Sequence, residues 1–282
     1  MDNNVNSDIL LVSTLEDEND GDFGAGDLSL REAIAIADEG ATINFDSNLS
    51  GGTISLTLGE LAIDKDLSIQ GLGANNLTVD GSFVGGEFPD FIITRVFNID
   101  DGDANTVKNV SIEDITITGG GQNLSGSGGG ILNQENLTLD STVISNNSTV
   151  FGSGGGIANF GNLVVDSSVV SGNSAGFRGA SGGGIANSGT ATIINSTVAN
   201  NSSFTIGGGI VNSGTLDIIG STVTNNNAAF TGDGISGSAT LTSTIVAGNG
   251  DDLEGTFTSG GNNLIGNGDD ICLLYTSPSP RD

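Results

Sequence analysis

Residues 181–187 read SGGGIAN, and this glycine triplet recurs along the chain at nearly constant intervals. The intervals between successive copies, the last of them a related GDGI, are 26, 28, 25 and 25 residues. A period of this size is typical of a solenoid, in which each repeat packs only against its neighbours. The copies begin at Gly128, Gly154, Gly182, Gly207 and Gly232.

Three other features keep step with the glycines. Each unit also contains three short stretches of alternating apolar and polar residues, and no apolar stripe of helical period. Units of about 25 residues with three short strands predict an all-β fold, a parallel β-helix with one coil per unit. The features are DSTV, DSSV, NSTV, GSTV and TSTI at 140, 166, 195, 220 and 242; Asn146–Asn147, Gly172–Asn173, Asn200–Asn201, Asn225–Asn226 and Gly248–Asn249; and Phe151, Phe177, Phe204, Phe230 and Phe257.

Equivalent positions in such a fold stack about 4.8 Å apart, so each feature becomes a row along the axis. Asparagines at tight corners accept left-handed backbone and are expected to pass amide hydrogen bonds from coil to coil. The phenylalanines are expected to stack in offset fashion, either inside or under a loop. The expected inward rows are Ile131, Ile157, Ile185, Ile210 and Ile235, and Val143, Val169, Val198, Val223 and Ile245. The expected outward row is Thr142, Ser168, Thr197, Thr222 and Thr244.

The N-terminal region carries the one segment that predicts a helix, from Leu30 to Asp38. Ser29 and Glu32 match a capping box, in which each residue satisfies a backbone amide of the other. A helix here would cover the open strand edge at the end of the rod. Its expected buried face comprises Ala33, Ile34 and Ala37.

Three regions follow from these patterns. Residues 1–40 are expected to form an N-terminal extension and helical cap, residues 41–270 about nine coils, and residues 271–282 a non-native tail. The tail, ICLLYTSPSPRD, holds the only cysteine, the only tyrosine and two of the three prolines, and resembles read-through of a sequencing adapter. With a single cysteine, no disulfide can form within the chain.

The segment DGDFGAGDLSLREAIAIAD at 20–38 resembles bacterial proteins named for their CSLREA motif, with LSLREAI at 28–34. TINFD at 42–46, GLGANNLTVDG at 71–81 and the closing GGNNLIGNG at 260–268 extend the resemblance. The GGGI repeats are similar to the GGA[IVL] repeats of polymorphic outer-membrane proteins. The resemblance implies a right-handed, single-stranded, pectate-lyase-like parallel β-helix that is secreted or surface-bound. Many relatives carry cysteines where this chain looks to have Phe23 and Leu28, so an apolar contact is expected in place of a disulfide.

The chain is strongly acidic, with 34 Asp and Glu against six Lys and Arg and a formal net charge of −28. Six cations cannot form the basic patch that nucleic-acid binding needs, so nucleic acid is excluded as a partner. Residues 119–231 carry only four of the carboxylates. The sequence shows no stretch long enough to span a membrane and no ordinary signal peptide.

Two catalytic functions can be compared with the sequence. A phosphate-binding loop needs GK[ST] and a following helix, and the glycine triplets have neither. The alternative is a polysaccharide lyase or glycoside hydrolase with carboxylates as acid and base. The chain has no histidine, and the enzyme reading requires two carboxylates in a groove beside Lys65, Arg95 or Lys108. The carboxylate candidates are Asp100, Asp101, Asp103, Glu113 and Asp114.

Calcium is the one cofactor that the sequence brings into question. The segment EDENDGDFGAGD at 16–27 is rich in oxygen ligands, although it departs from the EF-hand pattern at its first and last positions. The candidate metal ligands are Asp17, Asp20, Asp22, Asp101 and Asp103.

Taken together, the sequence predicts a non-catalytic, secreted or cell-surface β-helix that acts as a structural or adhesive display module of a larger bacterial protein. Its expected partner is a cell surface, a glycan or a protein. The alternatives are the polysaccharide-active enzyme and a carbohydrate- or ice-binding module that uses the outward threonine row. No catalytic residue is assigned.

Overall fold

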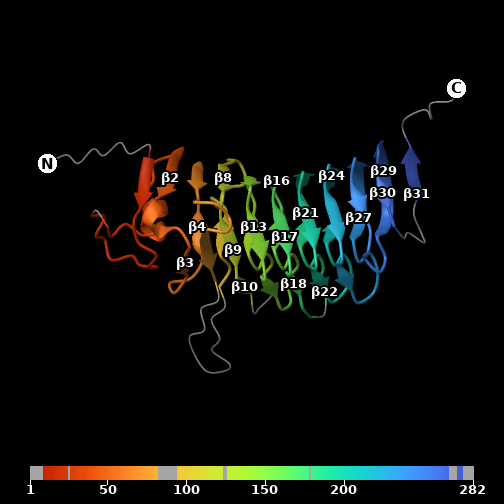
Figure 1. Ribbon diagram of the computed structural model, residues 1–282, viewed down its shortest axis with the longest axis horizontal. Helices are drawn as coiled ribbons and strands as arrows, with labels where there is room; N and C mark the ends of the chain where they lie inside the picture. The colour runs from red at the N-terminus through yellow and green to blue at the C-terminus, as the bar shows by residue number, and fades with distance from the viewer. Residues whose placement is uncertain are drawn as a thin grey trace.

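The computed structural model describes residues 9–24, 26–81, 94–122, 126–177, 179–266 and the strand at 272–275. These residues form a rod of stacked coils, with strands that lie side by side from one end to the other (Figure 1). All strand pairings among them are parallel. The predicted right-handed parallel β-helix is therefore confirmed.

Three sheets run along the rod. The long sheet contains β1 (Ile9–Val12), β2 (Ala41–Phe45), β4 (Leu61–Ile63), β5 (Leu67–Gln70), β7 (Phe97–Ile99), β8 (Asn109–Glu113), β11 (Ile131–Asn133), β12 (Asn136–Asp140), β15 (Ile157–Asn159), β16 (Asn162–Asp166), β19 (Ile185–Asn187), β20 (Thr190–Ile194), β23 (Ile210–Asn212), β24 (Thr215–Ile219), β27 (Ile235–Thr242), β29 (Leu253–Gly261) and β31 (Cys272–Tyr275). The second sheet contains β3 (Gly52–Ser55), β6 (Leu77–Asp80), β9 (Thr116–Thr118), β13 (Val143–Ser145), β17 (Val169–Ser171), β21 (Thr197–Ala199), β25 (Thr222–Thr224), β28 (Ile245–Val246) and β30 (Leu264–Ile265). The short sheet contains β10 (Gly121–Gln122), β14 (Ser148–Thr149), β18 (Ser174–Ala175), β22 (Ser202–Ser203) and β26 (Asn227–Ala228).

The glycine triplets lie at the corner that leads into the first strand of each coil. Their first glycine has a left-handed backbone, for example φ 73° at Gly154, and their second lies against the backbone of the next coil. A Cβ on Gly155 would lie 2.4 Å from the carbonyl oxygen of Ser174 in the same coil and 2.5 Å from that of Gly183 in the next coil. Glycine is required here because the backbones of adjacent coils approach within the space that a side chain would occupy. The isoleucines that follow are fully buried, which confirms the first inward row: Ile131, Ile157, Ile185, Ile210 and Ile235.

The second sheet corrects the predicted register of the STV segments. Val198 and Val223 point inward, but Val143 and Val169 do not, and Ile245 is 42% exposed. The cause is the corner residue before the strand, which has positive φ in every coil but occupies a different place within the four-letter segment. The inward row is Ile144, Val170, Val198, Val223 and Val246, and the paired outward row is Val143, Val169, Thr197, Thr222 and Ile245.

The predicted outward threonine row is wrong for the same reason. Thr142, Ser168 and Thr244 are buried, whereas Thr197 and Thr222 do lie on the outward side. The hydroxyls of the buried row accept hydrogen bonds from backbone amides of the preceding coil at 3.0 Å. The structure therefore has no continuous outward threonine array of the kind that ice binding would use, within the described coils. The buried row is Thr142, Ser168, Ser196, Ser221 and Thr244.

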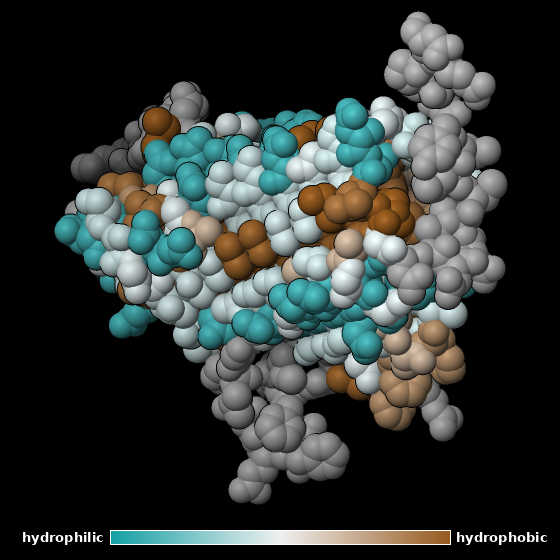
Figure 2. Space-filling model, turned by 45° about the vertical axis from the view of Figure 1, so that its right-hand side comes forward, coloured by the Kyte–Doolittle hydropathy of each residue, from teal (hydrophilic) through white to brown (hydrophobic). Residues whose placement is uncertain are grey.

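Some of the outward apolar residues lie toward the C-terminal end of the rod. Figure 2 shows brown side chains on that end of the rod, where Ile219, Ile245 and Leu264 are exposed.

The asparagine corner is confirmed. The first residue of each pair has positive φ, and the second is buried with its carboxamide stacked along the axis. Asn147 donates from Nδ2 to Oδ1 of Asn173 at 3.0 Å, and the same bond repeats through Asn201, Asn226 and Asn249. A second ladder, which the sequence analysis did not predict, joins the carboxamides of Asn133, Asn159, Asn187 and Asn212 at 2.7 Å.

The phenylalanine row lies outside the core, along the turns that follow the short sheet. Phe151 and Phe177 pack edge to face with ring centroids 5.2 Å apart, and Phe177 stacks on Phe204 at 6.0 Å. Phe230 is 70% exposed. Phe257, which was expected to continue the row, is instead fully buried in β29, because its strand carries it into the core.

The N-terminal cap agrees closely with the sequence. Helix α1 (Leu30–Ile36) has the predicted capping box, and a single 3-10 turn, η1 (Ser47–Leu49), comes after β2. Its expected face, Ala33, Ile34 and Ala37, is buried. Strand β1, which was not predicted, pairs with β2 and extends the long sheet at this end.

Of the two residues expected to make an apolar contact around the motif, only Leu28 is buried. Leu28 is buried in the core, whereas Phe23 is exposed and lies outside the core cluster.

At the other end, β31 pairs with β29. The non-native origin of residues 271–282 stays a prediction, and most of that tail lies outside the described residues.

Candidate functional site

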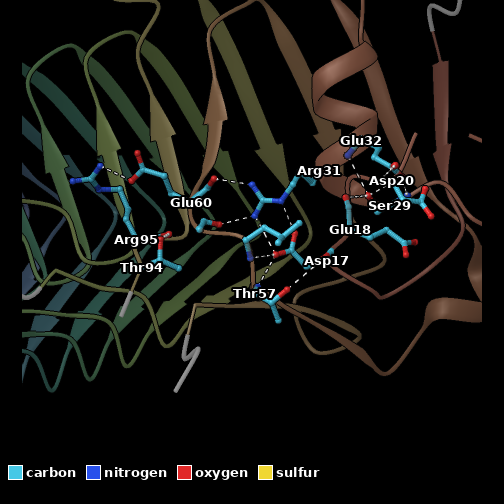
Figure 3. Close-up of polar contacts among 12 residues, drawn as sticks. Asp17, Glu18, Asp20, Ser29, Arg31, Glu32, Thr57, Glu60, Thr94 and Arg95 are labelled. Carbon is cyan, nitrogen blue, oxygen red and sulfur yellow. Dashed lines mark hydrogen bonds and ion pairs between the residues drawn. The ribbon is translucent and has the colours of Figure 1, made fainter. Parts of the chain in front are cut away.

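Asp17 fastens the cap to the first coils. Its carboxylate pairs with Arg31 at 2.7 Å and accepts the amides of Thr57 at 2.6 Å and Leu58 at 2.8 Å (Figure 3). The Asp17 side chain is 1% exposed. Arg31 also donates to the carbonyls of Gly59 and Glu60, so it joins the helix to the turn before β4. The oxygens of Asp17 that a metal would need are therefore engaged in structural contacts.

Glu32 organises the rest of the acidic loop. Its Oε1 accepts the backbone amides of Asp20 and Gly21, each at 3.1 Å, while Oε2 accepts the amide of Ser29. Asp20 in turn accepts the amide of Asp22 at 2.8 Å. The candidate ligands Asp17, Asp20 and Asp22 do not form a cluster of three converging ligand atoms in the described structure.

The same loop holds carboxylates in repulsive proximity. Burial, followed by the charge of Asp27, raises the pKa of Glu18. Burial, followed by the charge of Asp22, raises the pKa of Asp27. A carboxyl whose folded-state pKa is raised holds its proton more tightly when folded, so its ionised form destabilises the fold.

We expect Asp27→Asn to raise the melting temperature at about pH 7, well above the usual pKa range of aspartate, and to have much less effect at about pH 3, below that range. The sign follows from the raised pKa of Asp27, because its destabilising charge is present above the folded pKa and disappears as pH falls. Thermal melting by circular dichroism measures this. Asp217→Asn on β24 removes the same charge outside the loop and is the control. A lower melting temperature for Asp27→Asn at neutral pH would contradict the expectation.

Arg95 repeats the role of Arg31 further along the rod. It donates to Glu60 at 2.9 Å (Figure 3). It also donates to the carbonyls of Ser127 and Gly128. Burial lowers the pKa of the Arg95 guanidinium, and Glu60 opposes this shift. The two arginines thus donate hydrogen bonds to backbone carbonyls at one corner of the rod. In the later coils, the glycine triplets occupy this corner.

The two described lysines are also engaged. Lys65 donates to the carbonyls of Ile34, Ala35 and Ala37 at the C-terminal end of α1, where a cation is favourable. Lys108 pairs with Glu39 at 2.8 Å, which raises the pKa of the lysine and lowers that of the carboxyl.

A carboxylate cluster forms beside the turn between β11 and β12. Ligand oxygens of Asp100, Asp101 and Glu135 lie within 4.8 Å of one another, the one such group of three among the described residues. Glu135 is buried and accepts the amides of Asp101 at 3.3 Å and Lys108 at 2.8 Å. Hydrogen bonds from Thr106 and the Asp103 amide lower the pKa of Asp101. Oxygen ligands of this kind could hold calcium.

The structure brings some of the predicted residues together and separates others. Asp100, Asp103 and Glu135 line a hollow of about 390 Å³ with Thr106, Val107 and Gln134. Asp103 accepts the amide of Asn105 and is not part of the carboxylate cluster. Asp114 occupies the positive-φ corner, and Glu113 accepts from Ser111 at the end of β8. Glu135 was not predicted, because it joins the site only by stacking beside Asp101 and Lys108, which lie 34 and 27 positions earlier in the chain.

Comparison with known proteins supports the architecture. The chain is similar to the crystal structure of pectate lyase Pel9A, with a TM-score of 0.55 and 16% identity, covering 89% of this chain and 68% of that one. The fold is that of the pectate-lyase β-helix. A structure of ORF18 from Geobacillus virus E2 matches with a TM-score of 0.41 and 13% identity over 95% of this chain and 62% of that one. No protein-family model and no curated protein matches the sequence.

No helix among the described residues is long and apolar enough to cross a membrane.

Proposed function

We propose that this β-helix is a non-catalytic module of a secreted or cell-surface bacterial protein, which displays rows of side chains at fixed spacing for adhesion. The observation that carries the proposal is that the described arginine and lysine side chains are all engaged in structural contacts. Arg31, Lys65, Arg95 and Lys108 each bind groups that join the cap or one coil to the next. A lyase or hydrolase needs a base or acid that is free to meet substrate.

The surface location rests on the resemblance of the LSLREAI segment to CSLREA-motif proteins. The fold supports the display role because hydrogen-bonded ladders and close glycine corners fix the spacing between coils. A rigid scaffold of this kind presents its outward residues without the ordering cost that a flexible segment would incur on binding.

A polysaccharide-active enzyme is the second candidate, and the carboxylate cluster favours it. Two carboxylates on either side of a sugar bond can serve as acid and base. Asp101 meets part of this requirement, because it lies beside Asp100 and Glu135 and feels the charge of Lys108. The Lys108 ammonium, however, binds Glu39, and Lys65 binds the carbonyls that end α1.

The test incubates the purified chain with soluble pectic, neutral and amino-sugar polysaccharides, with and without added calcium. Reducing ends and unsaturated products are measured. We expect no turnover, together with retention of the protein on cell walls. Turnover that Asp100→Asn abolishes and that Asp140→Asn leaves intact would overturn the display proposal in favour of the enzyme.

A further inference from the structure

Three adjoining hollows with a mixed polar and apolar lining form a groove on the outer side of the long sheet. The hollow beside Asp100 adjoins a second of about 260 Å³ through Val107, Gln134 and Glu135. The second adjoins a third of about 270 Å³ through Asn136. Together they run from Gly40 to Thr190 over the stacked strands β2, β5, β8, β12, β16 and β20. Five steps between strands give a length of about 24 Å.

The groove combines apolar and hydrogen-bonding surfaces. Phe160 is 52% exposed and Val107 is 58% exposed, and both line the middle hollow. Beside them, the exposed carboxamides of Asn109, Asn136 and Asn162 form a ladder with bonds of 3.0 and 2.6 Å. Each of these carboxamides retains donor or acceptor capacity for a ligand, because the ladder uses only part of it.

The groove is also acidic. Asp66, Asp100, Asp103 and Glu135 line it, and the carboxylate of Asp101 lies beside that of Glu135. The nearby Lys108 ammonium is held by Glu39. A ligand with carboxylate or phosphate groups would therefore be repelled along this surface.

These features discriminate between classes of occupant. A peptide that adds a strand needs an unpaired sheet edge, and the strands beneath the groove are paired on both sides. An amphipathic helix needs a row of exposed apolar anchors, and the large exposed apolar side chains among the described lining residues are Phe160 and Val107, because Leu67 and Val110 are buried. A chain of sugar rings requires flat apolar contact and many hydrogen-bonding groups, and the groove supplies both.

We propose that this groove binds a glycan chain composed of sugars without carboxylate groups, with one ring packed on Phe160. The inference rests on the proposed display role and names its ligand class. It sets the chain apart from a binder of acidic pectic sugars, since the surface carries the same sign of charge as such a ligand.

The experiment exposes the full chain to an immobilised panel of neutral hexose, amino-sugar and uronic-acid oligosaccharides, followed by calorimetry with the best hexamer. We expect binding to a neutral or amino-sugar oligomer and about tenfold or greater preference over the uronic-acid oligomers. Phe160→Ala is expected to weaken binding about tenfold, while Phe230→Ala, which removes an exposed ring outside the groove, leaves it unchanged. Melting curves verify that both variants fold.

Each outcome is decisive. Absence of binding to every oligosaccharide, equal binding of uronic-acid oligomers, or equal effects of the two phenylalanine variants overturns the inference. If a glycan binds and is cleaved, the groove assignment stands and the non-catalytic role fails. If nothing binds while cell-wall retention persists, the groove assignment alone fails.

Discussion

Gly155→Ala is expected to lower the free energy of unfolding by about 3–5 kcal/mol, because its methyl group has no space between coils. The new Cβ would lie 2.4 Å from the Ser174 carbonyl oxygen and 2.5 Å from that of Gly183. Both obstacles are backbone atoms held by pairing with further coils, so relief requires the stack itself to move. Urea denaturation followed by circular dichroism measures the loss as a lower midpoint.

Gly176→Ala is the matched control. It adds the same methyl group just past β18, where the nearest atom is the Thr149 carbonyl oxygen at 3.5 Å. This is ordinary van der Waals contact, and we expect a change within about 0.5 kcal/mol. Equal midpoints for the two variants would show that the coils can separate, against the packing described above.

Asn173→Leu is expected to destabilise the chain by about 3–5 kcal/mol by interrupting the buried ladder. Asn173 accepts both the backbone amide and the carboxamide of Asn147 at 3.0 Å, and donates to the Ile144 carbonyl at 2.9 Å. Leucine has similar size but leaves the Asn147 amide without this acceptor. It also removes one hydrogen bond from the Asn147 carboxamide, which still donates to the Ile117 carbonyl, and one from the Ile144 carbonyl. Hydrogen exchange at the Asn147 amide, measured beside urea midpoints, locates the loss at the ladder.

Asn227→Leu tests whether any loss of asparagine has this effect. Asn227 lies in β26 of the short sheet with its side chain exposed. We expect its replacement to change stability within about 0.5 kcal/mol. A destabilisation by Asn227→Leu as large as that by Asn173→Leu would contradict the assignment of the energy to burial.

Much of the fold could be predicted from the sequence, because residues that recur once per coil stack into a single row along the axis. The isoleucine after each triplet and the asparagine after each left-handed corner are such letters. Ser29 and Glu32 predicted the cap because a capping box is local, with its two members three residues apart.

The register of the second sheet could not be predicted in the same way. One residue of positive φ turns each corner, and that residue is Ser141, Asn195 or Gly220 in different coils. Several residue types accept the left-handed backbone at this position, so matching letters do not mark matching positions. An alignment on the STV residues predicts the inward position correctly in two coils. In the other three it is off by one residue, which exchanges the inward and outward faces of the strand.

The candidate site was predicted only in part. Asp100, Asp101 and Asp103 stood out as neighbours in the sequence. Glu135 and Phe160 joined them only through the stacking of separate coils, and neither belongs to a recognisable motif. Phe160 breaks the period of the other phenylalanines, and this irregularity is the signal that could have drawn attention to it.

The buried ladder that begins at Asn147 has one further property, an electrical direction. Every carboxamide in it donates toward the C-terminal end, so the amide dipoles add along the axis as peptide dipoles add in a helix. The last donor, Asn249, meets the buried carboxylate of Asp252 at 2.8 Å. The Asp252 carboxylate thus faces the positive end of the row of dipoles. The rod therefore has an electric dipole along its axis, in addition to the direction of its strands.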